Sequence, residues 1–226
     1  MIKLVARFAD NGSDDINYIK IAASSAAYFG SRVVTLWQTG DTYISKCDGF
    51  ITISGDDFDP DELKNFISVI GATGISLSVS AAKKLGYPFE TYKVLKSVTG
   101  SAIPANFEAS TDEIYEILKA GEDGDIALPE RTAFMADLSH RIRHGTALAA
   151  VYKGTACVIP YISKGGALIC GVSAGASRGQ GFAGLCVAAA VKKAGKPCFT
   201  ICREALVPFY KKYGFCEAGE IAEIIF

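Results

Sequence analysis

The 226-residue sequence predicts an α/β (α+β) fold arranged as two tandem lobes. Apolar strands alternate with amphipathic helices in both halves, and half of the residues are apolar, which is ample for buried cores. The segment Lys83-Lys-Leu-Gly-Tyr87 has a counterpart in Lys211-Lys-Tyr-Gly-Phe215, each at the end of a predicted helix. Such an echo favours a duplicated domain. We predict a first lobe over residues 1–105 and a second over residues 106–226.

In the first lobe, the turn Asp48-Gly49 leads into a strand over residues 50–54. A helix from Pro60 to Ile70 follows, with proline in its first turn, and then a strand over residues 74–79. This order matches the order around the glycine-rich loop of the second lobe. An unrelated α/β domain that only ends a helix in Lys-Lys-x-Gly is the alternative.

In the second lobe, Ser110-Thr-Asp-Glu113 caps a helix through Lys119, and Pro129 opens a helix through about Arg143. Turn residues separate the strands that come next. The predicted strands cover residues 146–152, 156–163, 167–173, 198–202 and 220–226, with a helix over residues 182–194 between the third and the fourth.

Charge and cysteine usage limit the classes of function. The net charge is −1, and no basic stripe occurs, so the sequence predicts neither a nucleic-acid surface nor a membrane-binding patch. Charges interrupt the short apolar run at the N-terminus, which favours a cytoplasmic protein. The seven cysteines form no Cys-x-x-Cys pair and lie mostly in apolar segments, so we expect small buried hydrophobes and no metal site. The expected partner is a small molecule or a protein.

A glycine-rich loop, Arg178-Gly-Gln-Gly-Phe-Ala183, joins an apolar strand to an Ala-rich helix. A helix N-terminus offers unpaired N–H groups and a partial positive charge, which suits a pyrophosphate. A simple chain reversal is the plainer interpretation. The segment Gly175–Gly181 also mimics a dehydrogenase nucleotide loop, but too little chain follows it for the remaining strand-helix units of that fold.

Two motifs in order are more specific than the loop alone. Arg178, Gly181 and Ala183 match Arg/Gln-x-x-Gly-x-Gly/Ala, and Tyr210, Gly214 and Phe215 match Tyr-x-x-x-Gly-Phe. The second lobe therefore resembles the GNAT superfamily of acyl-CoA N-acyltransferases. The resemblance implies a mixed, mostly antiparallel sheet flanked by helices, acetyl-CoA as cosubstrate, no metal, and acetyl transfer to the amine of a small molecule or protein. A non-catalytic acyl-CoA-binding regulatory module is the alternative.

The resemblance also implies roles for individual residues. The pantetheine arm would pair with the strand end Gly171, Val172 and Ser173, and Tyr210 would be the general acid. Arg203 replaces a frequent asparagine and is expected to contact the coenzyme. The pyrophosphate would lie against the loop residues Arg178, Gly179, Gln180, Gly181, Phe182 and Ala183.

The first lobe lacks these features, which predicts a degenerate acyltransferase-like domain. Acidic residues (Asp56, Asp57, Asp59 and Asp61) replace the loop and would repel a pyrophosphate, and Ala82 replaces the tyrosine. No general base is evident. His140 and His144 have a zinc-compatible spacing, but a solvated basic helix end is the better interpretation. His140 and Glu204 are weak candidates for the acceptor pocket.

Overall fold

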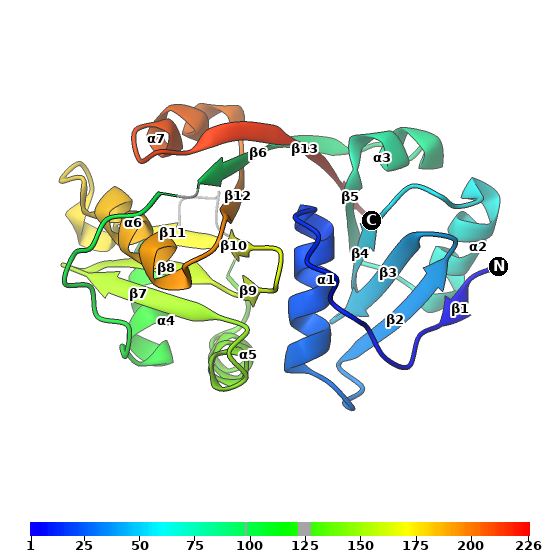
Figure 1. Ribbon diagram of the computed structural model, residues 1–226, viewed down its shortest axis with the longest axis horizontal. Coiled ribbons are helices and arrows are strands. Elements are labelled where there is room, and N and C mark those ends of the chain that lie inside the picture. The colour runs from blue at the N-terminus through cyan, green and yellow to red at the C-terminus, as the bar shows by residue number, and fades with distance from the viewer. Residues whose placement is uncertain (98, 122–127) are drawn as a thin grey trace.

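The computed structural model describes residues 1–97, 99–121 and 128–226, which form a mixed α/β architecture with helices packed around two sheets (Figure 1). The described strands make a ten-stranded sheet, in the order β1-β2-β3-β4-β5-β13-β6-β12-β10-β9, and a three-stranded sheet, β11-β8-β7. Among the described pairs only β4–β5 and β10–β12 are parallel. The predicted mixed, mostly antiparallel sheet flanked by helices is confirmed.

The first half begins with a short edge strand and a buried helix. Its elements are β1 (Lys3–Leu4), α1 (Ile16–Ala27), β2 (Val34–Thr39), β3 (Thr42–Cys47), β4 (Phe50–Ser54), α2 (Pro60–Ile70), β5 (Gly74–Ser78), α3 (Val79–Leu85) and β6 (Glu90–Ser97). The predicted strand 50–54 and helix 60–70 have the expected bounds. Asp59 caps α2, because its carboxylate accepts from the Glu62 N–H at 2.8 Å.

The second half carries a similar succession of elements. They are α4 (Thr111–Ala120), α5 (Arg131–Arg143), β7 (Leu148–Tyr152), β8 (Thr155–Ile159), β9 (Tyr161–Ile162), β10 (Ala167–Ile169), β11 (Gly171–Ser173), α6 (Phe182–Ala194), β12 (Cys198–Cys202), α7 (Val207–Lys211) and β13 (Cys216–Ile225). The predicted helix 182–194 and strand 198–202 have these bounds.

Several predicted boundaries differ from the structure. Strand β5 ends at Ser78 rather than at residue 79, where α3 begins, and β7 starts at Leu148 rather than at residue 146. Helix α5 starts after Glu130 rather than at Pro129, because the Glu130 carboxylate caps the Ala133 N–H at 3.1 Å. The predicted strand 156–163 is interrupted at Pro160, which has no N–H to donate. The predicted final strand starts earlier, at Cys216, because β13 continues across a bulge between Glu217 and Gly219.

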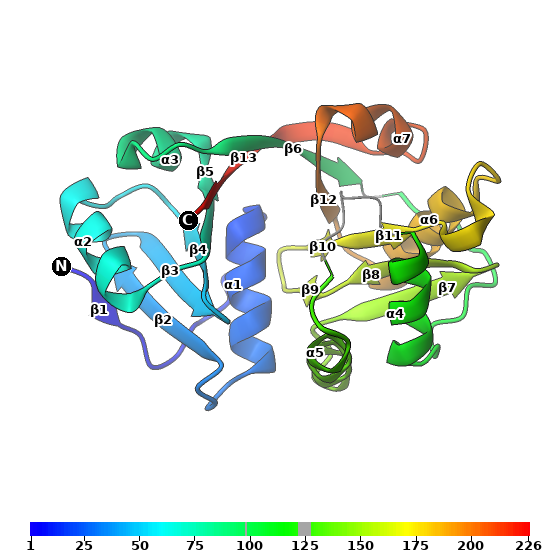
Figure 2. The same ribbon diagram turned by 180° about the vertical axis from the view of Figure 1, so that it is seen from behind.

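The last strand of each half lies on the sheet of the other half. Strand β13 pairs with β5 and β6, and β6 pairs with β12, so these two strands run side by side across the molecule (Figure 1, Figure 2). One continuous sheet therefore passes through both halves. The boundary near residue 105 and the duplication itself stay predictions.

The cores follow this exchange of strands. Ala222 and Ile224 of β13 are buried among first-half residues, and Leu95 of β6 is buried in the core of the second half. Helix α1 packs against β3 and β4 on one side and against β9 and β10 on the other. The two halves are thus held together by both backbone pairing and apolar packing. None of the helices in the described ranges has the length and apolar composition needed to cross a bilayer.

Candidate functional site

The parallel pair β10–β12 separates at Cys170, and a cavity of about 330 Å³ opens beside the separation. Strand β10 pairs with β12 as far as Ile169 and Thr200, after which β11 pairs with β8 instead. The predicted strand 167–173 is therefore two strands that belong to different sheets. The described residues around the cavity are Gly121, Cys170, Val172, Ser173, Ala174, Arg178, Ala183, Thr200, Ile201, Cys202, Leu206, Phe209 and Tyr210.

Strand β11 is the end strand of its sheet, so one of its edges has no strand partner among the described residues. The Cys170 N–H donates to the Val158 carbonyl of β8 at 3.1 Å. Val151 of β7 bonds to Asn106 on its outer side, so its partner Ala156 in β8 directs its N–H and C=O toward β11 and pairs there with Ser173. Gly171 and Ser173 therefore face β8, and Val172 directs its N–H and C=O to the open edge. The backbone of Val172 is available to an extended ligand in the cavity, as expected for the predicted pantetheine strand.

The glycine loop ends at the N-terminus of α6. Gly181 is the N-cap with φ of 77°, a left-handed conformation that favours glycine, and no side chain caps the helix. The first N–H groups of α6 therefore have no side-chain acceptor and carry the positive end of the helix dipole. Gly179 is also left-handed, with open space where a Cβ would lie. This is the geometry of an anion site.

The other predicted loop residues contribute differently. The Arg178 guanidinium lines the cavity and donates from Nη2 to the Gly121 carbonyl at 3.3 Å. The Phe182 ring instead contacts Tyr152, at 5.8 Å between ring centroids, so only its backbone faces the predicted anion site. Gln180 is exposed on the loop between these residues.

Tyr210 lies on α7 and lines the same cavity as Val172 and Ser173. The side chain is 7% exposed, and its ring packs on Phe209 and Phe215 with centroids 5.0 and 5.4 Å away. Burial raises the pKa of the Tyr210 phenol well above its usual range, although the Thr200 hydroxyl partly opposes the shift. Tyr210 is therefore a protonated hydroxyl at neutral pH and is suited to donate a proton.

Arg203 is placed apart from these residues. It is exposed at the start of the turn before α7 and is not among the described residues that line the cavity. Its charge lies near Tyr92 of β6: the hydrogen bond to Glu90 and burial raise the pKa of that phenol to about 12, and Arg203 opposes the rise. Its predicted contact with the coenzyme stays a prediction.

A second polar cavity, of about 230 Å³, lies between the halves and was not predicted from the sequence. Its cations are Lys20 of α1 and Arg141 of α5. Cys170 lines the first cavity and is exposed, contrary to the expectation that cysteines of apolar segments are buried, whereas Cys157, Cys186, Cys198 and Cys202 are buried. The only sequence signal was a single lysine in the otherwise apolar helix 16–27.

The corresponding place in the first half is closed. Phe58 is buried in the core together with Ala82, the residue at the position of the tyrosine. Lys84 Nζ donates to the carbonyl oxygens of Asp56 and Phe58 at 2.9 and 2.6 Å, which fixes the loop. The Asp59 carboxylate occupies the N-terminus of α2, where α6 has free N–H groups. This loop is therefore not available to an anionic ligand.

The weaker candidates have structural roles. His140 Nε2 lies 2.7 Å from the Ala27 carbonyl, and its ring stacks on Tyr28, so this histidine links α5 to α1. Glu204 forms an ion pair with Lys93 at 3.4 Å. Across the described part of the chain, no group of three potential metal ligands comes together.

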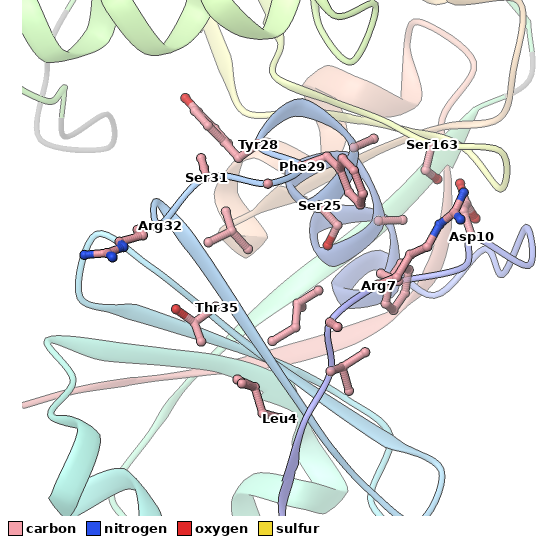
Figure 3. Close-up of a pocket in the computed structure, with 18 of the residues that line it drawn as sticks. Leu4, Arg7, Asp10, Ser25, Tyr28, Phe29, Ser31, Arg32, Thr35 and Ser163 are labelled. Carbon is pink, nitrogen blue, oxygen red and sulfur yellow. The ribbon is translucent and has the colours of Figure 1, made fainter.

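A larger cavity, of about 720 Å³, lies beside α1 and is lined mostly by first-half residues, with Ile162 and Ser163 from the second half, and it contains neither motif. Figure 3 shows Arg7 and Asp10 beside Ser163 at one end of this cavity and Arg32 at the other. None of the predicted site residues lines it in the part of the chain that the structure describes. It therefore has no part in the site around Tyr210.

The site and fold define an α/β protein whose sheet separates next to an uncapped helix N-terminus. No protein-family model matches the sequence, and no curated protein matches it significantly. Solved structures do match. A GCN5-related N-acetyltransferase from Kribbella flavida has a TM-score of 0.57 at 16% identity, covering 90% of this chain and 94% of its own.

Two further structures show the same likeness over both halves. An acetyltransferase of the GNAT family from Colwellia psychrerythraea has a TM-score of 0.53 at 14% identity, covering 100% of this chain and 99% of its own. A GCN5-related N-acetyltransferase from Sphaerobacter thermophilus has a TM-score of 0.54 at 13% identity, covering 92% of this chain and 85% of its own. The chain has the GNAT fold, as the two sequence motifs predicted.

Proposed function

We propose that this protein is an N-acetyltransferase that moves an acetyl group from acetyl-CoA to the amine of a small molecule or protein. One observation carries the proposal: an open strand edge, an uncapped helix N-terminus and a buried tyrosine converge on one cavity. Each of these features supplies one requirement of thioester aminolysis. The fold alone would not define the reaction.

Each step of the transfer is assigned to a different group of residues around the cavity. The open edge of β11 at Val172 holds the pantetheine arm, and the Val172 N–H polarises the thioester carbonyl. The first turn of α6, with Arg178 beside it, binds the pyrophosphate. When the amine nitrogen bonds to the acetyl carbon, the carbon–sulfur bond breaks and Tyr210 gives its proton to the leaving thiolate. The amine nitrogen loses one proton to solvent, and the Tyr210 phenolate regains a proton from solvent.

We further propose that the first half is a degenerate copy that has lost coenzyme binding. The support is its closed loop, in which Asp59 takes the place of an anionic ligand and Phe58 fills the interior. In this proposal the first half serves the second by donating a strand and one wall of a cavity.

A non-catalytic acyl-CoA-binding module is the second candidate. It is favoured by one observation: no carboxylate occurs among the described residues that line the coenzyme cavity. Such a module would bind acetyl-CoA and release no free thiol with any amine. Turnover separates the two candidates, because only the enzyme consumes the thioester.

Calorimetric titration with acetyl-CoA tests the site, using the intact protein, Gly181→Glu and Gly195→Glu. Gly195 is a matched control, because it is left-handed like Gly181, with φ of 63°, and caps the opposite end of α6. A carboxylate about 4 Å from the pyrophosphate costs roughly 4 kcal/mol at an effective dielectric constant of about 20, or about a thousandfold in Kd. We expect Gly195→Glu to bind normally. An intact protein that does not bind acetyl-CoA would refute both candidates.

A further inference from the structure

The cavity between the halves has walls from both of them. Helix α1 and strands β3 and β4 provide one wall, and α5 and β9 provide the other; α1 and β9 are neighbours in both ribbon views (Figure 1, Figure 2). The lining residues that bear charge are Lys20, Asp48, Asp137 and Arg141.

Arg141 is only 2% exposed, and its contacts hold its side chain in one position. Its Nε donates to both carboxylate oxygens of Asp137 at 2.9 Å, and Nη1 donates to Ser24 Oγ at 3.3 Å. The guanidinium lies against the rings of Tyr28 and Tyr161, 5.2 and 4.9 Å from their centroids. Within the described ranges Nη2 has no hydrogen-bond acceptor, so one donor group of a fixed fork remains available.

Lys20 is the second cation. Its Nζ donates to Ser76 Oγ at 3.0 Å, and the Ser76 hydroxyl donates onward to Asn17 Oδ1 at 2.9 Å. No carboxylate of the described residues lies within 4.0 Å of this ammonium. Burial lowers the pKa of Lys20, and the charges of Cys170, Glu223 and Asp15 oppose that shift. Because Asp15 and Glu223 act on this ammonium only through space, a directly bound anion would further offset the cost of enclosing it.

The charges of the cavity suit one small anion. Asp137 already offsets Arg141, and Asp48 is exposed and solvated, so neither carboxylate serves Lys20. The same two carboxylates would repel a dianionic group such as a phosphate more strongly than a monoanion. Arginine and lysine donors bind a carboxylate through short charge-assisted hydrogen bonds.

Cys170 relates the two cavities through the charges that act on its thiol. It lines the coenzyme cavity together with Ser173 and Tyr210. Its thiol touches solvent but is enclosed enough that burial raises its pKa to about 11, while Lys20 and Arg141 act in the opposite direction. Both cations therefore lie within electrostatic range of the point where β10 and β11 separate. In the inference that follows, a ligand anchored at the cations would reach past Cys170 toward the predicted thioester position.

We propose that this cavity binds the acceptor, and that the acceptor is a small primary amine carrying a carboxylate, which Lys20 and Arg141 bind. The identity of the amine as acceptor rests on the proposed acetyl transfer; the carboxylate site does not. The first half thereby supplies a specificity-determining residue, Lys20, to a reaction carried out by the second.

Matched acceptors test this inference. The probes are ω-amino acids of three to six carbons, their primary amides, and the corresponding carboxylic acids without an amine. Thiol release from acetyl-CoA reports acetylation, and calorimetry without coenzyme reports binding of the acids. We expect kcat/KM for the best amino acid to exceed that of its amide by about 10–100-fold, the range of one or two charge-assisted hydrogen bonds.

The variants are Lys20→Met, Lys20→Arg and the control Lys83→Met, an exposed lysine on α3 of the same half. Lys20→Met removes a half-buried charge at similar volume, so it is expected to fold and to bind acetyl-CoA as the intact protein does. We expect it to lose the preference for the carboxylate, and Lys20→Arg and Lys83→Met to keep it.

Two results would overturn the inference while leaving acetyl transfer in place. One is equal kcat/KM for amino acids and amides; the other is an unchanged preference in Lys20→Met. Another result would overturn the proposed acetyl transfer while leaving the carboxylate site in place. If no amine is acetylated but the acids bind and Lys20→Met abolishes that binding, the carboxylate site stands and the enzymatic function fails.

Discussion

Tyr210→Phe removes one oxygen from the buried end of the coenzyme cavity and nothing else. The ring keeps its packing on Phe209 and Phe215, so we expect the free energy of unfolding to change by no more than about 1 kcal/mol, the value of one hydrogen bond. If Tyr210 protonates the leaving thiolate, kcat falls by about 10²–10⁴. That loss corresponds to roughly 3–5 kcal/mol of transition-state stabilisation.

The same substitution should leave coenzyme binding nearly unchanged, because the pantetheine arm is expected on the backbone of β11 and the pyrophosphate on α6. The assay is steady-state thiol release at saturating acceptor, together with calorimetry for acetyl-CoA. Tyr115→Phe is the matched control: Tyr115 is 6% exposed on α4 and does not line the coenzyme cavity. A Tyr210→Phe protein that is folded, binds acetyl-CoA and retains more than about a third of kcat would refute the role of general acid.

Three further predictions concern stability. Ile224→Ala, at a C-terminal residue buried in the first-half core, should lower the free energy of unfolding by about 2–5 kcal/mol in urea titrations, whereas Ile225→Ala at the exposed neighbour should not. Asp59→Ala removes the α2 cap and should cost about 0.5–2 kcal/mol; a negligible loss would contradict the capping interaction. Burial raises the pKa of Cys198 from 9.0 to about 12, so the thiol stabilises the fold fully below pH 9 and loses this effect as pH rises toward 12. Cys198→Ala should flatten that alkaline decline, and an unchanged pH profile would refute the assignment.

Because of the strand exchange, the C-terminal segment stabilises both halves of the protein. Strand β13 hydrogen-bonds with both β5 and β6, and its residues Ala222 and Ile224 complete the core of the first half. Unfolding of one half therefore removes a strand from the other. This coupling predicts a single cooperative transition for the two halves.

Local elements could be predicted from the amino-acid sequence alone, and so could the loop that we propose binds the coenzyme. The bounds of helices 60–70 and 182–194 are those predicted, because a capping aspartate, a proline in the first turn and left-handed glycines act within a few residues of a helix end. The loop and Tyr210 were found in the same way. Their motifs lie close together in the chain, on either side of a single strand.

Strand pairing and the residues that face the loop from across the molecule could be seen only in the folded protein. The break at Cys170, the exchange of β6 and β13, and the placement of Lys20 beside Cys170 depend on residues far apart in sequence. An apolar strand can pair with any complementary edge, so its own residues do not specify its neighbour. The burial of Lys20 in a cavity results from the packing of both halves, and one lysine in an apolar helix signals it only weakly.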